Sequence, residues 1–125
     1  MEPKTLLIVE DEIPLLKALA QKLRSEGFNV LEATDGQEGY DSAIANKPDL
    51  ILTDIVMPNM DGLTMLQKLR QDPWGQTANI ILLTNLNDTK DIDTAIQSGV
   101  FEYLVKNDWK LKDVVDKIRG KLGQV

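Results

Sequence analysis

Four short apolar runs in this sequence each end at residues that are able to take part in metal or phosphoryl chemistry. Leu6–Val9 is followed by Glu10 and Asp11, Leu50–Thr53 by Asp54, Ile80–Leu83 by Thr84, and Tyr103–Val105 by Lys106. Carboxylates are preferred ligands of hard divalent cations such as Mg²⁺. A hydroxyl and an ammonium group are donors suited to an anion. The set is therefore typical of a site that holds a divalent cation next to a phosphoryl group.

Asp54 is the candidate nucleophile of this set. Its carboxylate can attack a phosphorus centre and form an acyl phosphate. Phosphoryl transfer depends mainly on in-line positioning and on neutralising the equatorial oxygens, and Lys106 with a bound Mg²⁺ would supply that neutralisation. The Thr84 hydroxyl would donate a hydrogen bond to a phosphoryl oxygen. Asp54, Thr84 and Lys106 are the candidate catalytic residues.

The composition excludes several other kinds of site. The sequence contains no cysteine and no histidine, which excludes thiolate and imidazole catalysis and the ligation of soft metals by these groups. Oxygen ligation stays open, and Mg²⁺ suits this residue set better than Ca²⁺ because Mg²⁺ typically takes one or two carboxylates with waters and phosphate oxygens. The net charge of -6 argues against direct nucleic-acid binding through a basic face.

The length and hydropathy indicate one domain and no membrane segment. A chain of 125 residues is long enough to form a single hydrophobic core. No apolar stretch approaches the roughly 20 residues that cross a bilayer, and the N-terminus lacks the layout of a signal peptide. We expect one domain over residues 1–125, located in the cytoplasm and without membrane contact.

The order of the apolar runs predicts the fold that must position these residues. Asn29–Ala33 is a further, weaker strand, and a helical stretch follows each strand, as with Leu63, Leu66 and Leu69 after the third. Strands that alternate with helices of about ten to fifteen residues predict right-handed crossovers and a parallel sheet covered on both faces. We predict an α/β fold of the flavodoxin-like (βα)5 type, a doubly wound parallel sheet with strand order 2-1-3-4-5.

This strand order predicts that the acidic residues meet. The first strand lies beside the third, so Glu10 and Asp11 are expected next to Asp54, at the edge where open α/β sheets bind ligands. Carboxylates at such close range repel one another, and a divalent cation removes the repulsion. Asp35 suits a helix N-cap, and Asp61 is expected to mark a turn and the start of a helix.

The motifs at the strand ends resemble those of the receiver domain of two-component response regulators, of the single-domain chemotaxis-regulator type. They are L-I-V-E-D-E at Leu7–Glu12, L-T-D-I-V-M-P-N-M-D-G at Leu52–Gly62, I-L-L-T at Ile81–Thr84 and Y-L-V-K at Tyr103–Lys106. The second motif is strong by itself, and all four in this order are very specific. The resemblance covers nearly the whole chain.

The resemblance implies a phosphorylation-activated signalling switch. Asp54 would be the phosphoacceptor, with a sensor histidine kinase or a phosphotransfer protein as the donor. Asp11 would be the principal Mg²⁺ ligand, with Glu10 close by and the backbone carbonyl of Val56 completing the metal site. The chain would not be an enzyme with a separate product, because it would catalyse only its own phosphorylation and dephosphorylation.

The resemblance also implies how the signal leaves the domain. Thr84 and Tyr103 are similar to the switch pair of the family, in which the threonine moves toward the phosphoryl group and the aromatic ring turns inward. A downstream protein would bind the face made by the fourth helix, the fifth strand and the fifth helix. The chain would be a monomer or a phosphorylation-dependent dimer.

Two positions depart from the family pattern. Asn107 follows Lys106 where the family usually has a proline, often after a cis bond; we predict a trans bond, because a cis bond to another residue costs about 3 kcal/mol. Asn85 follows Thr84 where a small residue is usual. We expect its amide to narrow access to the phosphoryl site and to slow both phosphorylation and hydrolysis, and unchanged rates in Asn85→Ala would refute this.

Three alternative functions follow from the same residues. A pseudo-receiver would act as a constitutive protein-interaction module without phosphorylation. An aspartate-nucleophile phosphohydrolase usually carries a second acid two residues after the nucleophile, where this chain has Val56. A flavodoxin-like cofactor binder is disfavoured because no phosphate-binding loop rich in Ser, Thr and Gly follows the first strand.

Overall fold

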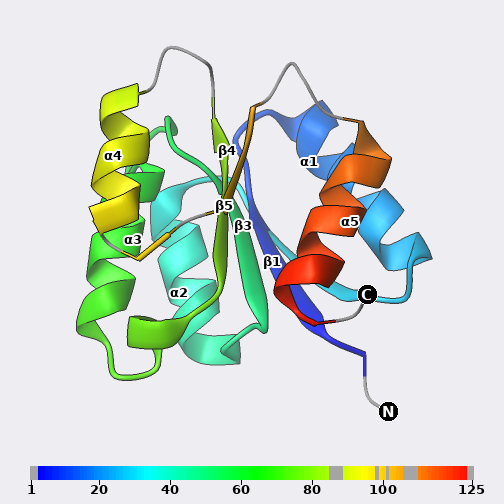
Figure 1. Cartoon of the computed structure of the whole chain (residues 1–125), viewed down its shortest axis with the longest axis horizontal. Helices are drawn as coiled ribbons and strands as arrows, with labels where there is room; N and C mark the ends of the chain where they lie inside the picture. The colour runs from blue at the N-terminus through cyan, green and yellow to red at the C-terminus, as the bar shows by residue number, and fades with distance from the viewer. Residues whose placement is uncertain (1–2, 85–88, 98, 101, 106–109, 124–125) are drawn as a thin grey trace.

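The computed structural model describes residues 3–84, 89–97, 99–100, 102–105 and 110–123. Over these residues, strands and helices alternate along the chain (Figure 1). The elements are β1 Thr5–Val9, α1 Ile13–Ser25, β2 Asn29–Ala33, α2 Gly36–Asn46, β3 Leu50–Asp54, α3 Gly62–Gln71, the 3-10 turn η1 Gly75–Thr77, β4 Ile80–Thr84, α4 Thr89–Gln97, β5 Glu102–Val105 and α5 Leu111–Lys121.

The strands form one parallel sheet in the order β2-β1-β3-β4-β5. This confirms the predicted flavodoxin-like fold and its strand order. Val9 at the end of β1 pairs with Ala33 of β2 on one side and with Thr53 of β3 on the other. The register therefore places the residues that follow β1 beside the end of β3. Those residues include the acids singled out above.

Helices cover both faces of the sheet, α1 and α5 on one face and α2, α3 and α4 on the other (Figure 1). Side chains of the strands alternate between the two cores: Leu6 and Ile8 pack on the α1 side, and Leu7 and Val9 pack on the α3 side. All four are 0% exposed. Burial on both faces explains why the run is apolar throughout rather than alternating.

The helices bury one stripe each against this sheet. In α1 the buried residues are Leu16, Leu19, Ala20 and Leu23, and full burial of such a leucine contributes about 1.5–3 kcal/mol. In α3 the buried residues include Leu66 and Leu69, as predicted, and the predicted Leu63 is partly buried and packs against the same core. Met65 is also buried in this stripe.

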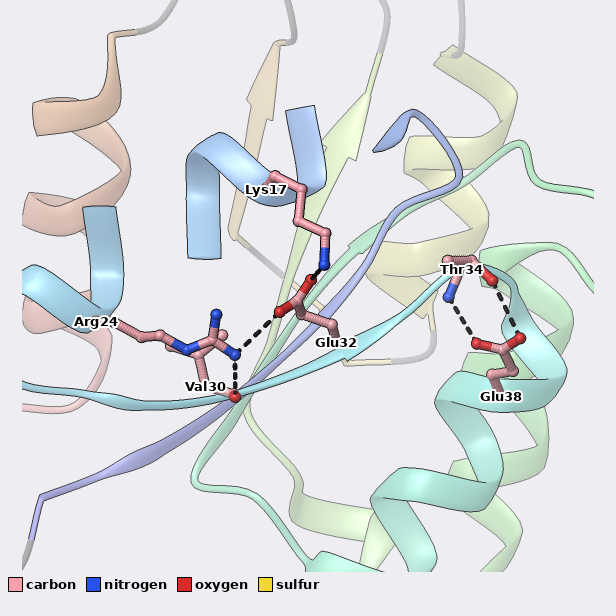
Figure 2. A network of polar contacts seen from close by, with 6 residues as sticks. All are labelled: Lys17, Arg24, Val30, Glu32, Thr34 and Glu38. Atoms are coloured by element: carbon pink, nitrogen blue, oxygen red, sulfur yellow. Dashed lines mark hydrogen bonds and ion pairs between the residues drawn. The ribbon is translucent and has the colours of Figure 1, made fainter. Parts of the chain in front are cut away.

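A group of ion pairs joins α1 to the edge strand β2 (Figure 2). Glu32 accepts hydrogen bonds from Lys17 Nζ at 2.8 Å and from Arg24 Nη2 at 3.0 Å. Arg24 also donates to the Val30 carbonyl oxygen at 2.9 Å. The Lys17 hydrogen bond, supported by Arg24, holds the pKa of Glu32 below its usual value. Charged side chains on an edge strand such as β2 also disfavour pairing with a further strand.

None of the helices in the described part of the chain combines the length and the apolar character needed to cross a bilayer.

Candidate metal centre at the carboxyl edge of the sheet

The carboxyl ends of β1 and β3 bring three carboxylates together. One carboxylate oxygen from each of Glu10, Asp11 and Asp54 lies within 4.8 Å of the other two. The strand register accounts for this, because Val9 pairs with Thr53 and the next residue of each strand reaches the same edge. The prediction that Glu10 and Asp11 lie next to Asp54 is confirmed.

These three acids differ in how much of each is exposed to solvent. Glu10 is 0% exposed and Asp54 is 6% exposed, whereas Asp11 is an exposed residue. Taking ionised carboxylates out of water is costly unless charges or hydrogen bonds compensate them. A hard divalent cation compensates several carboxylates at once, and Mg²⁺ usually keeps waters or phosphate oxygens among its ligands. A cluster with two buried acids and one acid at the solvent boundary fits that ligand set.

Backbone N–H groups orient two of the carboxylates. The Ile55 N–H donates to Asp54 Oδ1 at 2.7 Å, and the Glu12 N–H donates to Glu10 Oε2 at 3.1 Å. Hydrogen bonds to ionised acceptors are stronger than those between neutral groups. Both donors follow their acceptors closely in sequence, so the turns after β1 and β3 fix the acids before any ligand binds.

The loop after Asp54 folds back onto the end of β3. The Gly62 N–H donates to the Ile55 carbonyl oxygen at 2.7 Å, and a Cβ at position 62 would overlap the Asp54 carbonyl oxygen. Asp61 caps α3 by accepting from the Thr64 N–H at 2.7 Å, which confirms the predicted turn and helix start. A glycine at the first position of α3 is therefore what lets the loop close against the acidic cluster.

The same loop touches the start of α2. Asp35 caps α2, as predicted, by accepting from the Glu38 N–H at 2.8 Å. It also accepts from Asn59 Nδ2 at 2.8 Å, and the Glu38 N–H followed by the Asn59 amide lowers the pKa of Asp35. The sequence reasoning missed Asn59, which adopts a φ of 65°. A Pro-Asn pair in a turn is a usable signal, because asparagine tolerates the left-handed region.

The other predicted site residues lie at the end of β4 beside Asp54, in β5, in the loop after β3 or outside the described part. Tyr103 is in β5, in register with Leu82, and is 43% exposed. Thr84 ends β4, with its backbone paired to Val105, and its side chain is not among the described atoms. Lys106, Asn85 and Asn107 lie outside the described residues. The Val56 side chain is 64% exposed, so this residue lies at the surface of the loop.

Known sequences agree with the resemblance seen in the motifs. The family model described as response regulator receiver domain matches residues 6–119. Among curated proteins, the response regulator ArlR of Staphylococcus aureus is 36% identical over 117 residues, which is 94% of this chain and 52% of ArlR. The chain thus spans about half the length of the curated relatives it matches.

Solved structures agree as well. A two-component response regulator from Clostridium difficile has a TM-score of 0.86 and 26% identity, with 97% of each chain covered. The signal receiver domain of a signal transduction histidine kinase from Syntrophus aciditrophicus has a TM-score of 0.86 and 29% identity, covering 98% of this chain and 92% of that one. With its fold, its acidic cluster and its motif order, this chain belongs to the response regulator receiver domain family, the signalling domains of two-component systems.

Proposed function

We propose that this chain is a phosphorylation-controlled switch in which Asp54 accepts a phosphoryl group. The donor would be the phosphohistidine of a sensor histidine kinase or of a phosphotransfer protein. The observation that carries the proposal is the meeting of Glu10, Asp11 and Asp54 within 4.8 Å at the carboxyl edge of a receiver-type sheet. We take residues 1–125 as one receiver domain that acts on itself and on no separate substrate.

The proposed reaction is a direct transfer between two side chains. An Asp54 carboxylate oxygen attacks the phosphorus atom, and the new O–P bond forms as the N–P bond of the phosphohistidine breaks. The electron pair of the broken bond returns to the imidazole nitrogen of the partner. The hydrogen bond from the Ile55 N–H to Asp54 Oδ1 supports this role, because it holds the carboxylate in one orientation. In-line positioning is the main requirement of such a transfer.

Glu10, Asp11, Asp54 and the Val56 carbonyl are the proposed holders of Mg²⁺. When bound, the ion offsets the negative charge of the acids and of the phosphoryl oxygens. The burial of Glu10 and Asp54 supports this assignment, because their charges are close together and largely removed from water. Lys106 would hold a phosphoryl oxygen as a point charge, and Thr84 would donate to another.

The proposed output is a change on the face formed by α4, β5 and α5. Thr84 and Tyr103 would respond to the phosphoryl group, with the Tyr103 ring turning inward, and a downstream protein or a second copy of the chain would bind the altered face. The half-exposed position of Tyr103 supports the proposal, because the ring has solvent-exposed surface to lose.

The test is phosphorylation by a small donor. The chain is incubated with acetyl phosphate, with Mg²⁺ or with a chelator, and intact mass and peptide mapping locate the adduct. We expect a base-labile adduct on Asp54 that requires Mg²⁺ and is absent in Asp54→Asn. Rapid turnover without a persistent adduct would indicate a phosphohydrolase. A folded wild-type chain that forms no adduct would indicate a pseudo-receiver that works as an interaction module.

A further inference from the structure

We propose that the first turn of α2, through Asp35 and Gly36, positions the loop that follows Asp54 and thereby sets the affinity of the site for Mg²⁺. The inference rests on the proposed function and deepens it. Asp35 would be a positioning residue, since its hydrogen bonds go to Glu38 and Asn59 rather than to the acidic cluster. Two independent hydrogen-bonded connections between α2 and the loop, called ties below, support it.

The first tie is made by side chains. Asp35 uses its two oxygens in different directions: Oδ1 accepts from the Glu38 N–H at 2.8 Å, and Oδ2 accepts from Asn59 Nδ2 at 2.8 Å. Asp35 is only 8% exposed, so water competes little for these bonds. A buried carboxylate that accepts from both a helix N-terminus and a loop amide joins the two segments firmly.

The second tie is made by the backbone at the next residue of each segment. The Gly36 N–H donates to the Met60 carbonyl oxygen at 2.9 Å, and a Cβ at position 36 would overlap that oxygen. The absence of a side chain at Gly36 is therefore what allows this approach. Asp35 and Gly36, at the start of α2, are thus hydrogen-bonded to two consecutive residues of the loop, Asn59 and Met60.

The α2 start is itself braced (Figure 2). The Glu38 carboxylate turns back and accepts from the Thr34 N–H at 3.0 Å and from the Thr34 hydroxyl at 3.1 Å. Together with the Asp35 cap, this contact satisfies donors on both sides of the turn, the second of them on Thr34, the residue before the N-cap. The α2 start is therefore a firm anchor for the loop.

These ties bear on the metal site through Val56. A backbone carbonyl ligand has no rotamers of its own, so its position depends on how the loop is held at each side. On one side, Ile55 forms hydrogen bonds with both Asp54 and Gly62. On the other side, Asn59 and Met60 are bonded to α2. The Val56 side chain is 64% exposed, whereas its neighbours Ile55 and Met57 are buried in the core, so this packing and the flanking hydrogen bonds together fix the carbonyl.

An exchange of partners tests the side-chain tie. Asp35→Asn keeps an acceptor for the Glu38 N–H but replaces the charged acceptor of Asn59 by an amide, so that only a weaker neutral hydrogen bond can form once the Asn59 amide rotates. Asn59→Asp instead presents a carboxylate to the Asp35 carboxylate. In the double variant the amide at position 35 can donate to the carboxylate at position 59, so the tie is restored in the reverse direction with the net charge of the wild type. Asn59→Gly removes the donor while keeping a residue that accepts a positive φ.

Mg²⁺ affinity is measured by calorimetry on the full chain, with the rate of Asp54 phosphorylation and thermal unfolding measured alongside. Groups that orient metal ligands typically change affinity by 10- to 100-fold, and we expect about tenfold weakening in Asn59→Gly and a smaller weakening in Asp35→Asn. The double variant should bind more tightly than the product of its two single effects predicts, as expected for coupled partners. This coupling separates positioning from a long-range charge effect, which would be additive.

The matched control is Asp113→Asn. Asp113 accepts from the Lys110 N–H at 2.8 Å at the start of α5, so the variant makes the same charge change in another capping acid. We expect a lower thermal midpoint and unchanged Mg²⁺ affinity. Wild-type affinity in Asp35→Asn and Asn59→Gly, or purely additive effects in the double variant, overturns the inference alone. A wild-type chain that binds no Mg²⁺ and forms no adduct overturns the proposed function as well.

Discussion

Gly62 lies against the backbone of Asp54 so closely that a Cβ atom at position 62 would overlap the Asp54 carbonyl oxygen. The obstructing atom belongs to the backbone and not to a flexible side chain, so a side chain at position 62 requires the loop or the end of β3 to move. The first residue of α3 thus limits the position of the proposed phosphoacceptor.

Gly62→Ala is expected to lower the free energy of unfolding by about 1–3 kcal/mol, the usual cost of overpacking, and to slow phosphorylation of Asp54. Urea denaturation and the acetyl phosphate reaction measure the two effects. Gly120→Ala in α5 is the control, because a Cβ there meets nothing within 4 Å; alanine should stabilise that helix by about 0.5–1 kcal/mol. A Gly62→Ala chain as stable and as reactive as the wild type contradicts the prediction.

Asp11→Asn is expected to change the stability of the chain in opposite directions with and without Mg²⁺. In the absence of the ion, removing one of three carboxylates within 4.8 Å relieves repulsion and stabilises the chain by about 1 kcal/mol, given that Asp11 faces water. In the presence of Mg²⁺, the wild type gains stability that rises with the logarithm of the ion concentration relative to its dissociation constant, and the variant loses most of that gain. Thermal unfolding with a chelator and with a Mg²⁺ series measures both arms. A wild-type midpoint that Mg²⁺ does not move would count against the metal site.

The strand order could be predicted because it follows from local patterns. Continuous apolar runs between helical stretches allow few topologies, and one of these places β1 beside β3. The proximity of Glu10, Asp11 and Asp54 then follows from the sheet, since parallel strands end at one edge.

The parts that could not be predicted depend on packing between distant segments. Asn59 is 24 positions from Asp35, and only the folded loop brings its amide to that cap. Met65 is buried together with Leu66 and Leu69, and which side of α3 faces the sheet is decided by packing in the folded chain. The turn η1 is closed by Arg70, which donates to the carbonyl oxygens of Gly75 at 2.7 Å and Ala78 at 3.0 Å. No rule about the spacing of residues in the sequence predicts such contacts.

Phosphorylation is expected to reduce the solvent exposure of Tyr103. The side chain is 43% exposed in the structure, and the proposed inward turn of its ring removes that surface from water. Hydroxyl-radical footprinting with and without acetyl phosphate measures the change. Tyr40 is the internal control, because its ring is only partly exposed and lies 4.5 Å from Lys68 Nζ. Equal labelling of Tyr103 in both states, in a chain that carries the adduct, would reject the switch role.

Glu32 is expected to make stability depend on pH in the acidic range. Its pKa in the folded state is held below the usual value of 4.5 by the hydrogen bond from Lys17 and then by Arg24. A lowered carboxyl pKa gives stability that is fully present above 4.5 and that disappears as the pH falls through the folded-state pKa. The Lys17 and Arg24 side chains are 66% and 50% exposed, so we expect a contribution of at most about 1 kcal/mol.

Glu32→Gln tests this dependence directly. The variant should be less stable than the wild type near pH 7, and this deficit should be smaller near pH 3, because the stability given by a lowered carboxyl pKa is lost progressively as the pH falls below 4.5. Urea denaturation at both pH values gives the difference. Asp116→Asn is the matched control: Asp116 is 61% exposed and lies 3.9 Å from Lys112 Nζ, so its loss should change stability little at either pH. A Glu32→Gln deficit that is the same at both pH values would show that the lost stability comes from packing and not from the ionised carboxylate.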